Sequence, residues 1–147
     1  MNGSRLLQFL RQFQKYFDRQ FDEIVEAQDL TIREIHVLLF LANNPTHDTA
    51  RDITQLRGIP KSQVSQAVDL LAAEGLLLRT PDPGDRRMVH LSITPQGMPL
   101  ARECQAIQER CIQQMLNLLS PREQKQFQAC LNTLLENSVR FFEENYS

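Results

Sequence analysis

Residues 82–97 read DPGDRRMVHLSITPQG, and the fold predicted for this chain depends most on this stretch. It begins with turn-forming and charged residues, among them the adjacent basic pair Arg86 and Arg87. Apolar and polar residues then alternate over 89–93, which is the pattern of a strand with one buried face. Thr94 and Pro95 follow as a helix-start signal. The stretch therefore predicts a basic hairpin tip held on a strand that is anchored in a core.

The hairpin is predicted to pair strand 76–80 with strand 88–93, with its tip at 81–87. The alternation in the second strand gives these orientations: Val89, Leu91 and Ile93 inward, and His90 and Ser92 outward. A charged tip on a buried strand can reach a partner outside the protein, and the helices before it suggest that this partner is DNA.

A helix-turn-helix pattern precedes the hairpin. Capping boxes at 31–34 (TIRE) and 49–52 (TARD) predict two helix starts, because the paired side chains satisfy the first free backbone amides. Gly58 allows a sharp turn, and the next helix is predicted to begin at about Pro60. The inward face of that helix is predicted to carry Val64, Ala67, Val68 and Leu71. Two short helices joined by a glycine-containing turn are typical of this motif.

Long amphipathic helices are predicted on both sides of this module. Apolar residues recur at three- and four-residue steps from Leu6 to Ile24, which predicts one continuous helix. A helix from about Thr94 to about Leu119 contains Pro99, which we expect to remove a backbone hydrogen bond and kink it. A capping box at 120–123 opens the last helix, whose apolar residues include Phe127, Leu131, Leu134, Phe141 and Phe142.

The predicted fold class is mainly α with a small β wing. A winged helix-turn-helix DNA-binding module at 31–94 lies between helical dimerisation regions at 1–30 and 95–147. The flanking helices carry more apolar surface than the module can cover, so we expect a second copy of the chain to cover it. The alternative is an ordinary bundle within one chain.

Composition restricts the classes of function. With 147 residues, 41% of them hydrophobic, the chain is long enough for one globular domain with appended helices. No apolar run reaches the roughly 18 residues of a membrane span, and Gln8 and Arg11 interrupt the apolar residues near the start, so we expect a cytoplasmic protein. The net charge of −2 argues against an extended nucleic-acid coat, so any DNA site must be local.

Three motifs give the sequence a family resemblance. They are Asp85-x-Arg87 followed by Leu91-x-Ile93-Thr94-x-x-Gly97, then Ala73-x-Gly75-Leu76-Leu77-x-Arg79, and Ile59-Pro60-Lys61-Ser62-Gln63-Val64-Ser65. With these motifs and the helix order, the chain resembles the MarR family of winged-helix transcriptional regulators. The resemblance implies an obligate homodimer on a pseudo-palindromic operator in double-stranded DNA, with the recognition helix in the major groove and the wing in the flanking minor groove.

The resemblance also implies a set of DNA-binding residues. The reading positions of the recognition helix are Lys61, Ser62, Gln63, Ser65 and Gln66, the wing contacts are Arg86 and Arg87, and Asp85 supports the wing as the acid that orients Arg87. A glutamine can bond adenine through two atoms, and an arginine fits the negative potential of a narrow minor groove. The alternative is a solvated helix end beside a solubilising hairpin tip.

Two features depart from the family pattern. The family commonly has a Ser or Thr cap where Pro60 stands, which puts the start of the recognition helix in question. Basic charge is also thin, because that helix has one basic residue, Lys61, against the two acidic residues Asp69 and Glu74. An alternative function is therefore a winged-helix dimer that acts as a protein-interaction module without DNA readout.

No metal, cofactor or catalytic site is expected. The three histidines are predicted on a helix, a loop and a strand, without the i, i+4 spacing of a metal-binding pair. The five glycines form no phosphate-cradling loop, so we do not expect an enzyme. Cys104 and Cys111 lie on one helical face and are predicted as buried structural thiols, with oxidant sensing as the alternative.

The resemblance finally implies a small aromatic or phenolic effector that releases a repressor from DNA. Such an effector would bind where the long helices meet the winged module. The candidate lining residues are Arg11, Phe13, Tyr16 and His36. The alternative is that these aromatic residues are plain core, since a stripe at helical spacing usually is.

Overall fold

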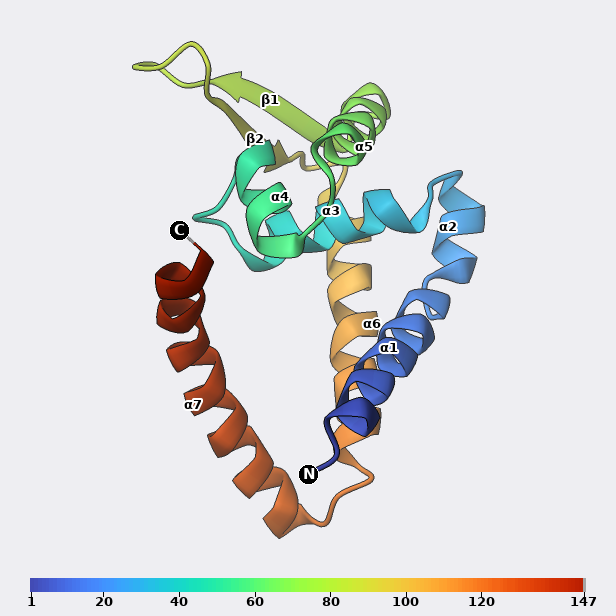
Figure 1. Ribbon diagram of the computed structural model, residues 1–147. Helices are drawn as coiled ribbons and strands as arrows, with labels where there is room; N and C mark the ends of the chain where they lie inside the picture. The colour runs from blue at the N-terminus through green and yellow to red at the C-terminus, as the bar shows by residue number, and fades with distance from the viewer. Residues whose placement is uncertain (147) are drawn as a thin grey trace. The chain divides into compact units, whose positions relative to one another are not determined.

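The computed structural model describes residues 1–146, which form seven helices and a two-stranded sheet (Figure 1). The chain divides into two compact units, of which the first is Met1–Gln108 and the second begins at Glu109. The first holds α1 (Gly3–Arg19), α2 (Asp22–Gln28), α3 (Ile32–Asn43), α4 (Ala50–Arg57), α5 (Lys61–Ala73), β1 (Leu77–Pro81) and β2 (Val89–Ile93). Helix α6 (Met98–Leu116) crosses the boundary, and α7 (Pro121–Tyr146) belongs to the second unit. The predicted fold class, mainly α with a small β wing, is confirmed.

The prediction of one continuous helix from Leu6 to Ile24 is wrong, because the helix is interrupted between α1 and α2. Phe21 lies at this break with its side chain fully buried, and its ring meets that of Phe17 edge-on at a centroid distance of 5.0 Å. Burying both rings and Ile24 requires the chain to change direction, so tertiary packing overrides a periodic pattern that is compatible with one helix.

The capping boxes that predict the helix-turn-helix are present. The Glu34 carboxylate accepts the Thr31 N–H at 2.9 Å, and the Asp52 carboxylate accepts the Thr49 N–H at 3.1 Å. Gly58 ends α4 with a φ of 73°, a left-handed conformation that favours glycine. The core of this module contains these fully buried side chains: Ile35, Leu38, Ile53, Val64 and Leu71. The predicted inward face of the recognition helix, α5, is thus the buried one.

Pro60 stands one position earlier than predicted. It is the N-cap of α5, with an extended ψ of 143°, rather than the first helical residue. A proline side chain has no oxygen with which to accept the free amides of the first turn, and no side-chain cap bond is present. The α5 start is therefore held by the preceding turn and by packing of Val64, which is fully buried.

The two strands pair antiparallel, with Leu77 opposite Ile93 and Thr80 opposite His90. Leu91 is buried, as predicted, but Val89 is exposed because the hairpin extends beyond the core at this point. His90 is half-buried rather than turned to solvent, because its ring bonds two carboxylates. The alternation rule therefore holds at the core end of the strand and fails toward the tip.

Helix α6 begins later than predicted, at Met98 rather than at Thr94–Pro95. Thr94 instead ties the end of the hairpin to its beginning: its hydroxyl donates to the Gly75 carbonyl at 2.6 Å and its N–H donates to the Leu76 carbonyl at 3.0 Å. Pro99 consequently lies in the first turn of α6, where no backbone N–H needs an intrahelical acceptor. The expected loss of a hydrogen bond and kink at Pro99 is a wrong prediction.

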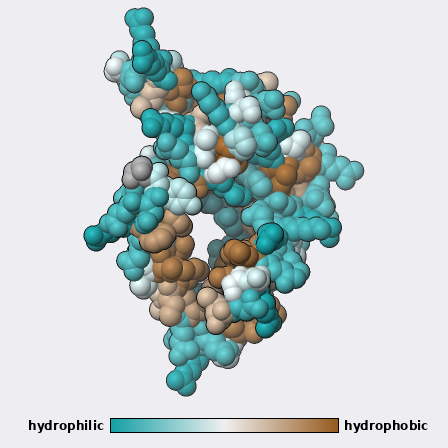
Figure 2. Space-filling model, in the orientation of Figure 1, coloured by the Kyte–Doolittle hydropathy of each residue, from teal (hydrophilic) through white to brown (hydrophobic). Residues whose placement is uncertain are grey.

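In the second unit, α7 begins at the predicted capping box. Ser120 N–H donates to the Glu123 carboxylate at 2.8 Å, and Glu123 N–H donates to the Ser120 hydroxyl at 3.3 Å. None of the described residues of α7 is buried. Its exposed apolar side chains are Phe127, Leu131, Leu134, Leu135, Val139, Phe141 and Phe142, and they give the brown colour along α7 in Figure 2. The predicted dimerisation region ends at Ser147, which lies outside the described residues.

Within residues 1–146, no helix combines the length and the apolar character that crossing a membrane requires.

Candidate nucleic-acid interface

Helix α5 turns its polar residues to solvent because its apolar residues face the core. All five predicted reading residues are exposed, namely Lys61, Ser62, Gln63, Ser65 and Gln66. The side-chain amide oxygen of Gln66 accepts a hydrogen bond of 3.1 Å from the guanidinium of Arg33 on α3. This contact could not be predicted from residue spacing, since the two residues are 33 positions apart.

The wing lies beside α5 at one end of the first unit (Figure 1). Its tip is built by carboxylates that accept backbone amides: Asp82 accepts from Gly84 and Asp85, each at 2.9 Å, and Asp85 accepts from Arg87 at 2.9 Å. The predicted support by Asp85 thus reaches the main chain of Arg87 rather than its guanidinium. Both wing arginines are exposed, and the hairpin tip is hydrophilic in Figure 2.

The base of the wing is tied to the loop before α4 through His90. The ring Nδ1 lies 2.8 Å from the Asp48 carboxylate, and Nε2 lies 2.7 Å from the Asp82 carboxylate. These bonds, Asp82 first, raise the pKa of His90, and the bond to His90 holds the pKa of Asp82 below its ordinary value. The alternation of residues along the strand does not predict this group of His90, Asp48 and Asp82, because Asp48 is 42 residues away along the chain.

Several acids of this surface are already engaged. Asp69 of α5 forms an ion pair with Arg79 of β1, and Asp82 bonds His90. Within residues 1–146, the guanidinium groups of Arg86 and Arg87 form no ion pair. The wing tip therefore presents two arginine side chains without an ion-pair partner, on a chain whose formal net charge is −2.

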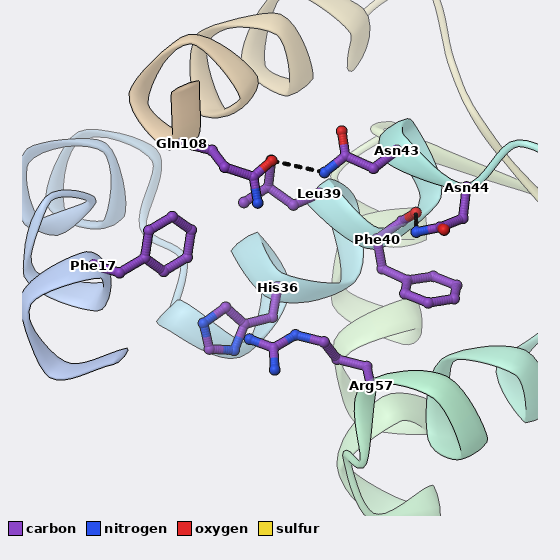
Figure 3. Close-up of a pocket in the computed structure, with 8 residues that line it drawn as sticks. All are labelled: Phe17, His36, Leu39, Phe40, Asn43, Asn44, Arg57 and Gln108. Carbon is purple, nitrogen blue, oxygen red and sulfur yellow. Dashed lines mark hydrogen bonds between the residues drawn. The ribbon is translucent and has the colours of Figure 1, made fainter. Parts of the chain in front are cut away.

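A cavity of about 180 Å³ lies at the other side of α3, lined by Phe17, His36, Leu39, Phe40, Asn43, Asn44, Arg57 and Gln108 (Figure 3). Of the four residues predicted to bind an effector, the structure places His36 in this lining. Arg11 donates instead to the Leu7 carbonyl within α1, and Phe13 stacks between Phe9 and Phe17. Tyr16 lies against the Phe13 ring.

The polar groups of the cavity have defined roles. His36 Nε2 lies 2.8 Å from the Asp18 carboxylate, while burial and, more weakly, the charge of Arg57 lower the pKa of the imidazole. The ring is therefore neutral near pH 7 and donates to Asp18 through Nε2. Asn43 donates to Gln108 at 2.8 Å, as the dashed line in Figure 3 marks. Arg57, in the last turn of α4, was not predicted to line this cavity, because no residue spacing relates α4 to the first helix.

Cys104 and Cys111 are buried, as the interpretation of both as structural thiols predicts. Both side chains are fully buried, and burial raises the pKa of Cys104 to about 12 and also raises that of Cys111. Thiolate is the reactive form, so both side chains are held as thiols. Cys130 on α7 is exposed. Among the described residues, no three side chains of His, Cys, Asp or Glu are grouped to hold a metal ion.

Comparison with known proteins finds a family model that matches part of the chain. Residues 28–88, from the end of α2 to the wing, match the model of the MarR family. The transcriptional repressor MprA of Escherichia coli K12 is 24% identical over 115 residues, and the HTH-type transcriptional regulator PecS of Dickeya dadantii is 28% identical over 106 residues. These alignments cover 78% and 71% of this chain but 65% and 62% of the relatives, so the chain spans less than two thirds of their length.

Solved structures share the fold over nearly the whole chain. A MarR transcriptional regulator from Methanosarcina mazei superposes with a TM-score of 0.77 at 17% identity, covering 94% of this chain and 99% of that one. S. aureus MepR, solved in complex with DNA, gives 0.69 at 23% identity, covering 93% and 98%. Bordetella bronchiseptica BpsR, whose DNA binding is regulated by 6-hydroxynicotinic acid, gives 0.66 at 25% identity, covering 88% and 98%.

The fold, the helix-turn-helix with its wing and the match over residues 28–88 agree with the resemblance to the MarR family that the sequence motifs carry.

Proposed function

We propose that this chain is a homodimeric regulator of transcription that binds double-stranded DNA in a sequence-specific manner, and that it acts as a repressor. The observation that carries the proposal is the pairing of an exposed polar recognition helix with a wing tip whose two arginines have no acidic side-chain partner among the described residues. MprA is a transcriptional repressor and PecS a transcriptional regulator, which supports the same role here.

In this proposal α5 enters the major groove and the wing reaches the neighbouring minor groove. Gln63 reads base edges, while Lys61 and Ser62, at the start of α5, meet the phosphate backbone. Arg86 and Arg87 enter the minor groove, where a narrow groove concentrates negative potential. Because Lys61 is the one basic residue of α5, the wing arginines supply a larger share of the affinity than they would in a more basic protein.

A second copy of the chain is proposed to cover the exposed apolar faces. On α1 these residues are Leu6, Leu7, Phe9 and Leu10, and each is at least 41% exposed. On α7 the apolar residues are exposed along the whole helix. Contiguous apolar faces of this kind mark interaction surfaces, and a two-fold dimer matches a two-fold operator.

The test of the function is a binding assay on DNA from upstream of the gene that encodes this chain. We expect a discrete complex that a tenfold excess of scrambled DNA leaves intact, since specific sites are bound about 10³-fold or more tighter than random sequence. A footprint with two-fold symmetry is the expected pattern. A folded dimer that binds every sequence equally, or none, would favour the protein-interaction module instead.

We also propose that a small aromatic acid is the effector and that it binds in the cavity beside His36. The guanidinium of Arg57 can pair with a carboxylate, and Phe17 and Phe40 provide flat apolar walls (Figure 3). The cavity volume of about 180 Å³ is below the roughly 300–1,000 Å³ of sites for drug-sized ligands, which favours a single ring. Regulation of BpsR by 6-hydroxynicotinic acid supports this ligand class.

Thermal unfolding with benzoate, salicylate and 6-hydroxynicotinic acid tests this site. At a ligand concentration about 100 times Kd, binding to the folded state adds about 2.7 kcal/mol and raises Tm by several degrees. Arg57→Gln should abolish the rise, and Arg51→Gln, a substitution at an exposed arginine on the same helix, should keep it. Equal stabilisation by the neutral amides of these acids would rule out the role of Arg57.

A further inference from the structure

The ring of His90 lies between carboxylates that come from two different parts of the winged module. Asp48 belongs to the loop that precedes α4, and Asp82 stands at the base of the wing tip. A neutral imidazole has one donor and one acceptor nitrogen, so it can donate to one carboxylate alone. Only the imidazolium donates to both. Bonds of 2.8 and 2.7 Å to two carboxylates are therefore the arrangement of a protonated ring.

A continuous series of hydrogen bonds runs from this ring to the proposed DNA contact. The second oxygen of Asp82 accepts the N–H groups of Gly84 and Asp85, and Asp85 in turn accepts the N–H of Arg87, all at 2.9 Å. These bonds set the backbone path of the tip. Any movement of the Asp82 carboxylate therefore moves the main chain that carries both arginines.

The other side of the ring is fixed to the helix-turn-helix. The Asp48 carbonyl accepts the Leu91 N–H at 2.7 Å, and Leu91 is buried. Asp48 directly precedes Thr49, the N-cap of α4. His90 is thus the side chain through which the first helix of the DNA-binding motif and the wing tip are joined.

We propose that His90 is a positioning residue that fixes the wing arginines relative to the helix-turn-helix, and that the affinity for DNA depends on whether this ring is charged. The inference rests on the proposed DNA-binding function. His90 itself needs no contact with DNA. Loss of its proton removes one of the two bonds and leaves a ring nitrogen lone pair facing a carboxylate, so the ring no longer ties Asp82 of the wing to Asp48 of the loop.

The charged groups that face the ring determine the direction of the pH effect. They are Asp48 from the loop and Asp82 from the wing, while the residue opposite on β1 is Thr80, which does not titrate. Hydrogen bonds to Asp82 and Asp48 raise the pKa of His90 above its ordinary value. A raised pKa means that the bridge is fully present below the ordinary histidine value and is lost as pH rises through the raised value.

The first experiment measures DNA affinity at constant salt between pH 6 and pH 9. For the wild type we expect affinity to fall by roughly tenfold over this range, since one charge-assisted bond is lost in each protomer. His90→Gln should bind weakly and without this pH dependence. His47→Gln is the matched control, because His47 is a neighbouring exposed histidine outside the bridge, and it should keep the wild-type profile. A wild-type affinity that is flat with pH would overturn the proposal.

Asp82→Asn separates positioning from simple damage. An asparagine carbonyl still accepts the amides of Gly84 and Asp85, and its NH₂ donates to a neutral ring nitrogen while the other nitrogen donates to Asp48. We therefore expect this variant to hold its affinity at pH 9, where the wild type loses it. If Asp82→Asn instead weakens binding equally at every pH, His90 is a structural residue alone.

A readout without DNA distinguishes failure of this inference from failure of the proposed function. NMR titration of the His90 ring should give a pKa above the ordinary value of about 6.5, and the backbone amide of Arg87 should shift with the same midpoint. Both shifts should disappear in His90→Gln. If the chemical shift of the Arg87 amide does not change as the His90 ring titrates, the proposed link from the ring to the wing is overturned, whether or not the protein binds DNA.

Discussion

Arg87→Ala is expected to weaken binding to operator DNA by about 10- to 100-fold, which corresponds to the roughly 1–3 kcal/mol of one well-placed base or groove contact. The expected loss is large for this chain because positive charge on the recognition helix is limited to Lys61. The exposed guanidinium of Arg87 is the group removed, while the Asp85 bond to its backbone amide is retained, since alanine keeps that N–H. Fluorescence anisotropy on the specific duplex at fixed salt measures the effect.

Two further variants make this result interpretable. Arg102→Ala removes an exposed arginine on α6 and should bind as the wild type does. Gln63→Ala removes a proposed base contact. It should therefore lower the affinity for the specific site more than it lowers the affinity for scrambled DNA. If wild type and Arg87→Ala bind alike, the wing has no part in recognition.

Local chemistry made the starts of α3, α4 and α7, and the wing, predictable from the sequence. A capping box needs two side chains three residues apart, so Thr31 with Glu34 and Thr49 with Asp52 could be located without knowledge of the fold. The same holds for the reading residues, because one amphipathic helix determines which of its side chains face solvent. Their roles on DNA remain predictions.

The features that could not be predicted from the sequence depend on contacts between distant segments of the chain. The break at Phe21 follows from burying that ring against Phe17, and the periodic pattern is satisfied equally by one helix or two. The cavity joins residues of α1, α3, α4 and α6, so neither Arg57 nor Gln108 could be assigned to it from spacing. The bridge at His90 likewise needs Asp48, which the loop brings alongside β2.

Gly97, directly before α6, lies against the Leu76 carbonyl that precedes β1 and against Ile93 at the end of β2. A Cβ on this residue would lie 2.4 Å from the Leu76 carbonyl oxygen and 3.1 Å from Ile93 Cγ2. The Leu76 carbonyl cannot withdraw freely, because it accepts the Thr94 N–H at 3.0 Å. Backbone on both sides of the contact is therefore fixed, and the site has no room for a methyl group.

Gly97→Ala should accordingly lower the free energy of unfolding by about 3 kcal/mol, at the upper end of the usual cost of overpacking, and lower Tm by about 10 °C. Urea denaturation should show a lower midpoint with an unchanged slope, since the surface exposed on unfolding is the same. Gly3→Ala is the matched control, because a Cβ at Gly3 meets nothing within 4 Å and alanine favours the helix there. Equal stability of the two variants would contradict the close approach at Gly97.

Because Thr94 and Gly97 anchor the second strand to α6, Gly97→Ala should lower DNA affinity as well as stability. The Arg87 substitution should instead reduce DNA affinity and leave the unfolding midpoint unchanged.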